Sequence, residues 1–246
     1  MADFSVGYSK INTPQFLWGV EFAERIGLQL GQSVLDIGCG TGELTAFLAD
    51  KVGEHGCVLG TDPSEGRIVL AKEKFADRPN LRFVHAGITD IPCGCMMYLY
   101  DVVFSSSVFH WISNEELLSG LIYVRETLMQ PYNSFVAIQT PTSAPCFEEV
   151  LNLLPEGSQA IAKPNYRTVD ENHELFTKAG FEDISVEVVQ RSFPMEDRQA
   201  LRDYEYYSTD GLVDLDDERL SSVDWKKNSA GQLLIEYSYA LVLARK

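Results

Sequence analysis

The stretch VLDIGCGTG, from Val34 to Gly42, decides the fold of this chain. Its first four residues are mostly apolar and lead into a glycine-rich turn, and a helical pattern begins near Gly42, which predicts a strand, a tight loop and a helix. Glycines allow backbone N–H groups to approach a ligand closely, and α/β sheets bind nucleotides at the carboxyl ends of their parallel strands. We therefore predict that residues 34–42 form a cofactor-binding loop.

The spacing and charge of this loop indicate which cofactor it takes. The glycines follow a G-x-G-x-G frame, whereas the dinucleotide fingerprint is G-x-G-x-x-G. Asp36 stands two residues before the first glycine, where its charge would repel a pyrophosphate and attract a sulfonium or ammonium group. A nicotinamide-dependent dehydrogenase is therefore the disfavoured rival class. The predicted cofactor-binding residues of the loop are Asp36, Gly38, Cys39 and Gly40.

Outward from the loop, short runs rich in valine and isoleucine alternate with stretches of helical period, a pattern typical of an α/β fold with a parallel sheet. The expected strands are Ser33–Ile37, Val58–Thr61, Leu81–His85, Asp101–Ser105, Ser134–Gln139, Phe181–Gln190 and Leu234–Ala244. The expected helices are Gln15–Ile26, one from about Gly42, Ser64–Ala76, Asn114–Met129 and Asp170–Lys178.

The last two expected strands are separated by a polar segment with helical character. Between Glu196 and Asp224, acidic residues outnumber basic ones and alternate with leucines and tyrosines. This pattern predicts a small helical cap over one end of the sheet, with its aromatic residues facing inward. We expect one domain over residues 1–246, with a cofactor-binding core over 30–140 and the cap inserted over 192–232.

A second acid, Asp62, ends the next expected strand. Neighbouring parallel strands end side by side, so this carboxylate is placed to accept two hydrogen bonds from a ribose diol. Alternatively, Asp62 only caps the helix that is entered through Pro63, and both roles can hold together. Further predicted cofactor-binding residues are Tyr8, Pro63, Gly87, Ile88 and Ser105.

Four segments together resemble a known family. VLDIGCGTG, VLGTDPS, YDVVFSSSVFHWI and the final strand YSYALVLARK are similar to the motifs of class I S-adenosylmethionine-dependent methyltransferases. Within this family the chain is most similar to the trans-aconitate and juvenile-hormone-acid methyltransferase group, whose members pair a His-Trp or Gln-Trp after the fourth strand with a helical insertion near the C-terminus.

The resemblance implies a Rossmann-like sheet of seven strands, mostly parallel with an antiparallel last strand, and helices on both faces. It also implies S-adenosyl-L-methionine as the cofactor and O-methylation of a small carboxylic acid. One position departs from the pattern, because Gly87 stands where relatives commonly carry an aspartate that contacts adenine. Asp90 either replaces that contact or only shapes a turn.

Methyl transfer from a sulfonium needs alignment and desolvation from the protein. A carboxylate acceptor is already ionised, whereas a hydroxyl acceptor needs a base within hydrogen-bond reach. His110, just beyond the fourth strand, is the candidate catalytic residue, as a base or as a hydrogen-bonding group that orients the acceptor. The alternative is a purely structural histidine.

A carboxylate acceptor would also need a local cation, because the chain has 36 acidic and 20 basic residues and a net charge of −16. Arg167 is the candidate for that cation, and a solvated loop arginine is the alternative. The predicted substrate-binding residues are Gln15, His110, Trp111, Tyr166, Arg167, Tyr204 and Tyr207. Each aromatic residue among them could instead belong to the core.

Composition excludes several partners. The acidic balance disfavours nucleic acid and anionic membranes, and no apolar run is long enough to cross a bilayer or to act as a signal peptide. We expect a cytoplasmic monomer or homodimer that acts on a small molecule. The five cysteines are expected to be reduced, and Cys93 and Cys95 lack a second ligand pair for zinc. Open alternatives are a hydroxyl or amine acceptor and a non-catalytic cofactor-binding protein.

Overall fold

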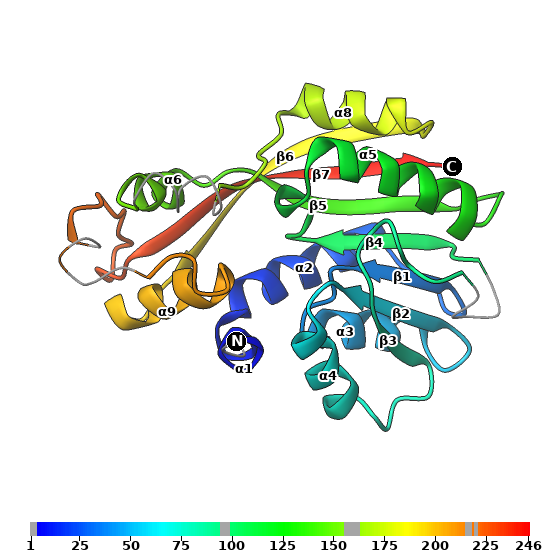
Figure 1. The fold of residues 1–246 in the computed structure, drawn as a ribbon, viewed down its shortest axis with the longest axis horizontal. Coiled ribbons are helices and arrows are strands. Elements are labelled where there is room, and N and C mark those ends of the chain that lie inside the picture. The colour runs from blue at the N-terminus through cyan, green and yellow to red at the C-terminus, as the bar shows by residue number, and fades with distance from the viewer. Residues whose placement is uncertain (1–3, 94–98, 155–162, 215–217, 219–220) are drawn as a thin grey trace.

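The computed structural model describes residues 4–93, 99–154, 163–214, 218 and 221–246, and it shows a seven-stranded sheet (Figure 1). The strand order is β3-β2-β1-β4-β5-β7-β6. The first five strands run parallel, and β7 pairs antiparallel with both β5 and β6. The predicted Rossmann-like fold is therefore confirmed. The strands are β1 (Ser33–Ile37), β2 (Cys57–Asp62), β3 (Leu81–His85), β4 (Val102–Ser106), β5 (Phe135–Ser143), β6 (Glu182–Pro194) and β7 (Leu234–Arg245).

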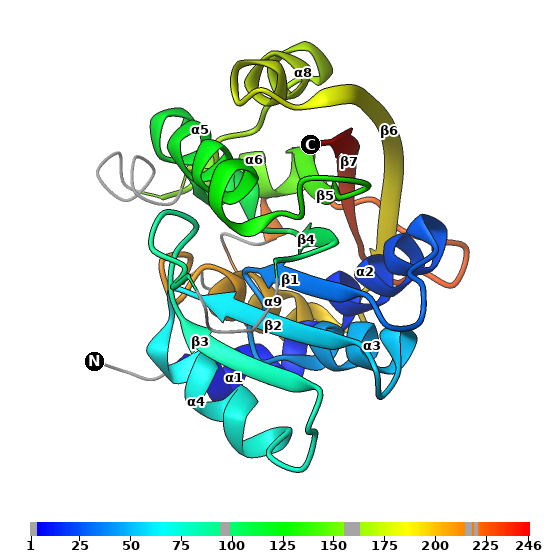
Figure 2. The same cartoon turned by 90° about the vertical axis from the view of Figure 1, so that its right-hand side faces the viewer.

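Helices cover both faces of the sheet, as Figure 2 shows. Side chains alternate along a strand, so each strand contributes to two apolar layers. Leu35 packs in one layer with Leu117 and Phe176, whereas Val34 packs in the other with Leu48. The helices are α1 (Ser5–Ile11), α2 (Thr13–Ile26), α3 (Glu43–Val52), α4 (Glu65–Lys74), α5 (Asn114–Tyr123), α6 (Pro145–Asn152), α8 (Val169–Lys178) and α9 (Arg198–Ser208).

Some expected boundaries differ from the structure. The predicted helix Asn114–Met129 is α-helical only to Tyr123 and continues as a π-helix over Val124–Leu128. The helices α1 and α6 were not expected, since α1 is short and polar and α6 follows a strand that is longer than predicted. Cys39, Cys57, Cys93 and Cys146 have free thiols, and Cys95 lies outside the described residues. Among the described helices, none is long and apolar enough to cross a membrane.

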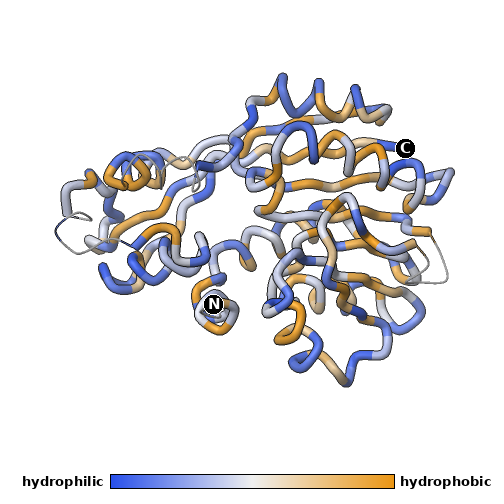
Figure 3. The backbone as a smooth tube through the Cα atoms, in the orientation of Figure 1, coloured by the Kyte–Doolittle hydropathy of each residue, from blue (hydrophilic) through white to orange (hydrophobic). Residues whose placement is uncertain are grey.

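The site lies where the connections between strands change from one face of the sheet to the other. β1 and β4 are neighbours, yet β1 leads to α3 on one face and β4 leads to α5 on the other. Loops that diverge in this way leave a crevice at the carboxyl ends of the strands. Figure 3 shows the apolar strands of the sheet beside a largely hydrophilic α9.

The cap is carried by an arm of the sheet. β6 and β7 continue their pairing to Pro194 and Leu234, beyond the part of β7 that pairs with β5. α9 packs on this arm through Leu201 and Tyr204. A second apolar cluster joins α6 to Val213 and Val223, so α6 supports the cap from the other side.

Glu205 lies on the buried face of α9. It is 2% exposed, and its Oε2 has no hydrogen-bond partner among the described residues. Burial disfavours the charged form and raises the pKa of Glu205 to about 8. The folded state therefore holds this proton more tightly than the unfolded chain, and its stability falls as the pH rises from about 4.5 to about 8.

We predict that Glu205→Gln stabilises the protein above pH 8 by on the order of 3 kcal/mol and has little effect below pH 5, because glutamine cannot ionise. Urea unfolding at pH 5 and pH 9 measures this difference. The exposed Glu196→Gln is the matched control and should change neither curve. An equal effect of Glu205→Gln at both pH values would contradict the raised pKa of Glu205.

Candidate active site

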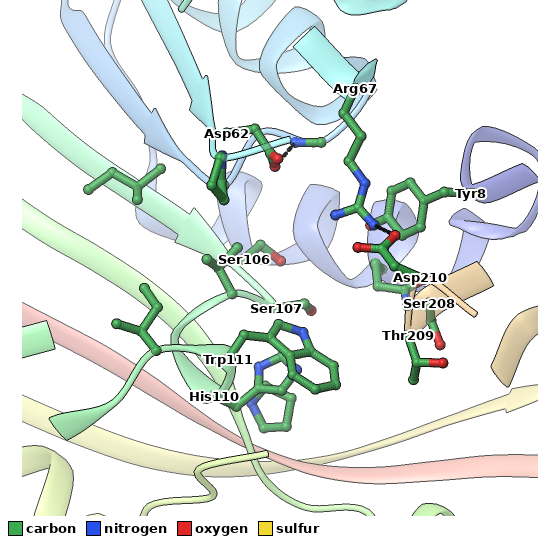
Figure 4. Close-up of a pocket in the computed structure, with 18 of the residues that line it drawn as sticks. Tyr8, Asp62, Arg67, Ser106, Ser107, His110, Trp111, Ser208, Thr209 and Asp210 are labelled. Carbon is green, nitrogen blue, oxygen red and sulfur yellow. Dashed lines mark hydrogen bonds and ion pairs between the residues drawn. The ribbon is translucent and has the colours of Figure 1, made fainter. Parts of the chain in front are cut away.

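A cavity of about 410 Å³ occupies the crevice at the ends of the strands (Figure 4). Its cofactor-side wall is formed by the turns after β1, β2 and β3, and its other wall by the turn after β4 together with β5, β7 and the cap. The residues predicted from sequence that line it are Tyr8, Gln15, Gly38, Gly40, Asp62, Pro63, Gly87, Ile88, His110, Trp111, Tyr166 and Tyr204.

The glycine loop is fixed to the end of β2. Gly38 and Cys39 donate from their backbone N–H groups to the carbonyl of Thr61, at 2.7 and 2.9 Å. Gly40 donates to Asp62 Oδ2 at 3.0 Å, and Ser64 donates to Asp62 Oδ1 at 2.8 Å. Each carboxylate oxygen keeps a second lone pair, so Asp62 can hold the loop and still accept from a ligand. The residue that caps α4 is Ser64, whose Oγ accepts from the Arg67 N–H at 3.4 Å, so the capping role foreseen for Asp62 is wrong.

All three glycines of the loop have backbone angles that favour glycine. Gly38, Gly40 and Gly42 have φ of +77°, +56° and +89°. A Cβ on Gly38 would lie 2.2 Å from Val108, and one on Gly40 would lie 3.3 Å from the ring of Tyr8. The turn therefore presents bare backbone to the cavity, and a larger residue at position 38 would collide with the β4 turn.

Asp36 does not line the cavity. It is 2% exposed and accepts a hydrogen bond from Thr45 Oγ1 at 2.7 Å, below the glycine turn. Burial is the largest cause that raises the pKa of Asp36 to about 7. Its carboxyl is therefore partly protonated near neutral pH, and the direct charge effect expected from sequence does not operate at the cavity surface. Asp62 and Asp210 are acids that do reach that surface.

Three other predicted residues also lie outside the cavity wall. Cys39 is buried under the loop, where a Cβ on Gly60 would meet its sulfur. Ser105 donates to the carbonyl of Ile37 at 2.7 Å and joins β4 to β1. Tyr207 packs against Gly7 of α1. These side chains shape the walls of the site without facing its interior.

Arg67 closes the cofactor side and was not predicted. Its guanidinium stacks on the Tyr8 ring at 4.3 Å from the centroid and pairs with Asp210 at 2.5 Å (Figure 4). The contact joins α4, α1 and the turn after α9. The missed signal was the position of Arg67 in the first turn of the helix that Ser64 caps, but the partner of Arg67 lies 143 residues away in the sequence.

His110 and Trp111 form the turn after β4 and face the cavity (Figure 4). The His110 ring lies 6.2 Å from the Tyr166 ring in a stacked arrangement and 4.6 Å from the Trp111 ring. His110 is 6% exposed, and burial lowers the pKa of its imidazole to about 3, with Arg167 acting in the same direction. The ring is therefore neutral at physiological pH and is a poor base.

Arg167 is not placed as a substrate cation. It is 4% exposed, does not line the cavity, and donates to the carbonyls of Phe109 and Ile112 at 2.8 and 2.6 Å and to Asn114 Oδ1 at 2.7 Å. All these acceptors belong to the turn that carries His110 or to the helix after it. The guanidinium is thus committed to holding the β4 turn, which a sequence alone does not reveal.

The acceptor-side wall is mostly aromatic, and Glu116 of α5 and Asp210 of the cap are carboxylates that also line the cavity. Tyr237 and Tyr239 of β7 join Tyr166 and Tyr204 there, and neither of the β7 tyrosines was predicted. Gln15 donates to the Tyr204 hydroxyl at 2.8 Å, and Tyr239 shares a 2.9 Å hydrogen bond with Ser107. Burial raises the pKa of all four phenols above its usual range. The wall therefore offers neutral hydroxyl groups.

Comparison with known proteins shows what part of the chain is similar to methyltransferases. A family model described as a methyltransferase domain matches residues 34–130. Demethylmenaquinone methyltransferase from Shouchella clausii is 38% identical over 77 residues, which cover 30% of this chain and 33% of that protein. Demethylmenaquinone methyltransferase from Lactococcus lactis is 28% identical over 67% of this chain and 71% of that protein. The chain spans about a third of the length of most such relatives.

Structural similarity extends further than sequence similarity. A S-adenosylmethionine-dependent methyltransferase from Aquifex aeolicus superimposes with a TM-score of 0.59 over 100% of both chains, at 17% sequence identity. The finer grouping with trans-aconitate and juvenile-hormone-acid enzymes is not shown by these relatives. Residues 34–130 thus match a methyltransferase domain model, and the described chain has the fold of a solved S-adenosylmethionine-dependent methyltransferase.

Proposed function

We propose that the protein transfers a methyl group from S-adenosylmethionine to the carboxylate of a small organic acid. The observation that carries the choice of acceptor is the aromatic wall after β4, where the His110 imidazole and the phenols of Tyr166 and Tyr204 are poor proton acceptors at neutral pH. A carboxylate is the oxygen nucleophile that needs no proton removed.

The cofactor side fits S-adenosylmethionine. Asp62 has free lone pairs for a ribose diol, and the bare backbone at Gly38 and Gly40 leaves room for the chain of the cofactor. Gly87 and Ile88 line the wall where an adenine would lie, and Asp90 Oδ1 is 3.3 Å from where a Cβ of Gly87 would stand. The Tyr8 ring under Arg67 covers the loop from the solvent side.

Bound S-adenosylmethionine supplies a methyl group on a positively charged sulfur, and its transfer to a carboxylate leaves an ester and a neutral thioether without moving a proton. The chain's residues would hold the acceptor in line and exclude water. The acceptor-side wall contributes neutral donors, since the phenols of Tyr166, Tyr204 and Tyr237 keep their protons. These donors can orient a carboxylate without a full positive charge.

The negative charge of a carboxylate acceptor would then be offset by the cofactor and not by an arginine. Arg167 is committed to backbone carbonyls and Arg67 to Asp210, so neither provides a free cation. The sulfonium is itself the positive partner for a carboxylate, and their attraction is stronger in a closed cavity than in water. A hydroxyl or amine acceptor would lack this attraction, and a hydroxyl would need a base on the aromatic wall.

We predict that Asp62→Asn weakens binding of both S-adenosylmethionine and S-adenosylhomocysteine by about tenfold or more, because one acceptor for the ribose becomes a donor. Isothermal titration calorimetry gives both affinities. The exposed Asp77→Asn should bind normally, and neither protein should bind NAD. Equal affinity of Asp62→Asn and wild type would remove Asp62 from the cofactor site.

We predict that label from methyl-labelled S-adenosylmethionine enters organic acids in a mixed panel of acids, phenols, amines and demethylated quinols. A methyl ester releases its label as methanol in mild alkali, whereas a methyl ether or amine keeps it, so the product class is read directly. Alkali-stable label would overturn the carboxylate assignment while preserving the methyltransferase. No transfer to any compound would favour a non-catalytic binding protein.

A further inference from the structure

The two nitrogens of the His110 ring face different surroundings. Nδ1 is sealed from solvent and has no hydrogen-bond partner among the described residues. The ring lines the cavity, and because Nδ1 is sealed, Nε2 on the other edge of the ring is the nitrogen left for a bound acceptor. A proton on Nδ1 would be a buried donor without an acceptor, which costs the desolvation of that group.

Arg167 places a fixed positive charge next to this ring. Its guanidinium donates to the carbonyls of Phe109 and Ile112, on either side of His110 in the chain, and also to Asn165, whose own N–H donates to the His110 carbonyl at 2.6 Å. The rings of Trp111 and Tyr166 that pack on His110 carry no charge. Burial is the larger cause of the lowered pKa of this imidazole, and the positive charge of Arg167 lowers it further.

These surroundings favour one form of the ring. The positive charge opposes a second proton on the ring, and a proton on the sealed Nδ1 would lack an acceptor. The remaining proton then lies on Nε2 and points into the cavity. A neutral imidazole in this form donates a hydrogen bond and has no lone pair free to take a proton from a ligand.

We propose that Arg167 is a positioning residue, which fixes His110 as a neutral ring with its proton on Nε2, so that His110 donates a hydrogen bond to the methyl acceptor and removes no proton from it. This inference rests on the proposed function for the identity of the acceptor. The state of the ring does not depend on that function, because it follows from the folded chain alone.

The wild-type protein, without substrate, tests the state of the ring. In ¹⁵N-labelled protein, the His110 signals are assigned by their loss in His110→Gln, with the exposed His173→Gln as control. The expected result is one imidazole that does not titrate between pH 5 and pH 8, with a protonated Nε2 and an unprotonated Nδ1. A ring that titrates in this range, or that carries its proton on Nδ1, would overturn the inference.

Arg167 variants test the source of this state. Arg167→Lys keeps the positive charge and should keep the His110 ring neutral, whereas Arg167→Gln should let it titrate closer to the usual range of histidine. A folded Arg167→Gln whose ring still does not titrate would assign the effect to burial alone and overturn the role of Arg167. If Arg167→Gln does not fold, the comparison of Arg167→Lys with wild type decides, since a lysine that shifts the ring out of its neutral form contradicts the proposal.

Transfer rates test the use of the hydrogen bond. Glutamine can place an amide N–H near the position of Nε2, so His110→Gln should retain activity within about fivefold of wild type, and His110→Ala should lose on the order of thirtyfold. Equal losses in both variants would mean that proton removal or ring packing matters, against the proposal. If wild type methylates no acid, the proposed function fails while the ring measurement stands, so the two failures are distinguishable.

Discussion

The site depends on one constraint, the attachment of the glycine loop to the end of β2. Asp62 receives the Gly40 N–H at 3.0 Å, and the Thr61 carbonyl receives two further loop N–H groups. These bonds hold the positive-φ turn in place and at the same time aim the carboxylate of Asp62 at the cavity. The loop, the backbone of Ser64 at the start of α4 and the candidate ribose contact therefore meet at Asp62, and a change at Asp62 affects all three.

On the other side of the crevice, the nearby arginines are engaged by the protein itself. Arg167 donates its hydrogen bonds to the turn after β4, and Arg67 is paired with Asp210. The acceptor wall presents neutral phenols and a neutral imidazole beside the carboxylates of Glu116 and Asp210. In a protein with a net charge of −16, a wall of this kind suits a reaction in which the electrophile brings its own positive charge. This is the physical link between the burial of His110 and the choice of acceptor.

Local patterns predicted the sheet well. β1 and β3 have the expected bounds, because each is a short apolar run bounded by turn residues. The glycine loop and Asp62 could be placed next to one another because both follow strands that are neighbours in this fold. The cap between β6 and β7 was visible as an acidic, tyrosine-containing interruption between two β-rich runs.

Contacts between distant segments could not be predicted in this way. Arg67 meets Tyr8 and Asp210 only after α1, α4 and the cap come together. Tyr239 reaches the cavity because β7 inserts next to β5, and Arg167 is buried because its loop folds back on the β4 turn. For Asp36, the sequence indicated an acid at the right place, but the depth of its burial is a property of packing.

A crystal structure of the complex with S-adenosylhomocysteine tests the central claim most directly. The account predicts ribose hydroxyls within hydrogen-bond distance of both Asp62 oxygens, the bare backbone of Gly38 and Gly40 against the amino-acid chain, and the sulfur facing the wall of His110 and the tyrosines. A nucleoside bound elsewhere on the protein, or a sulfur that faces away from that wall, would contradict it.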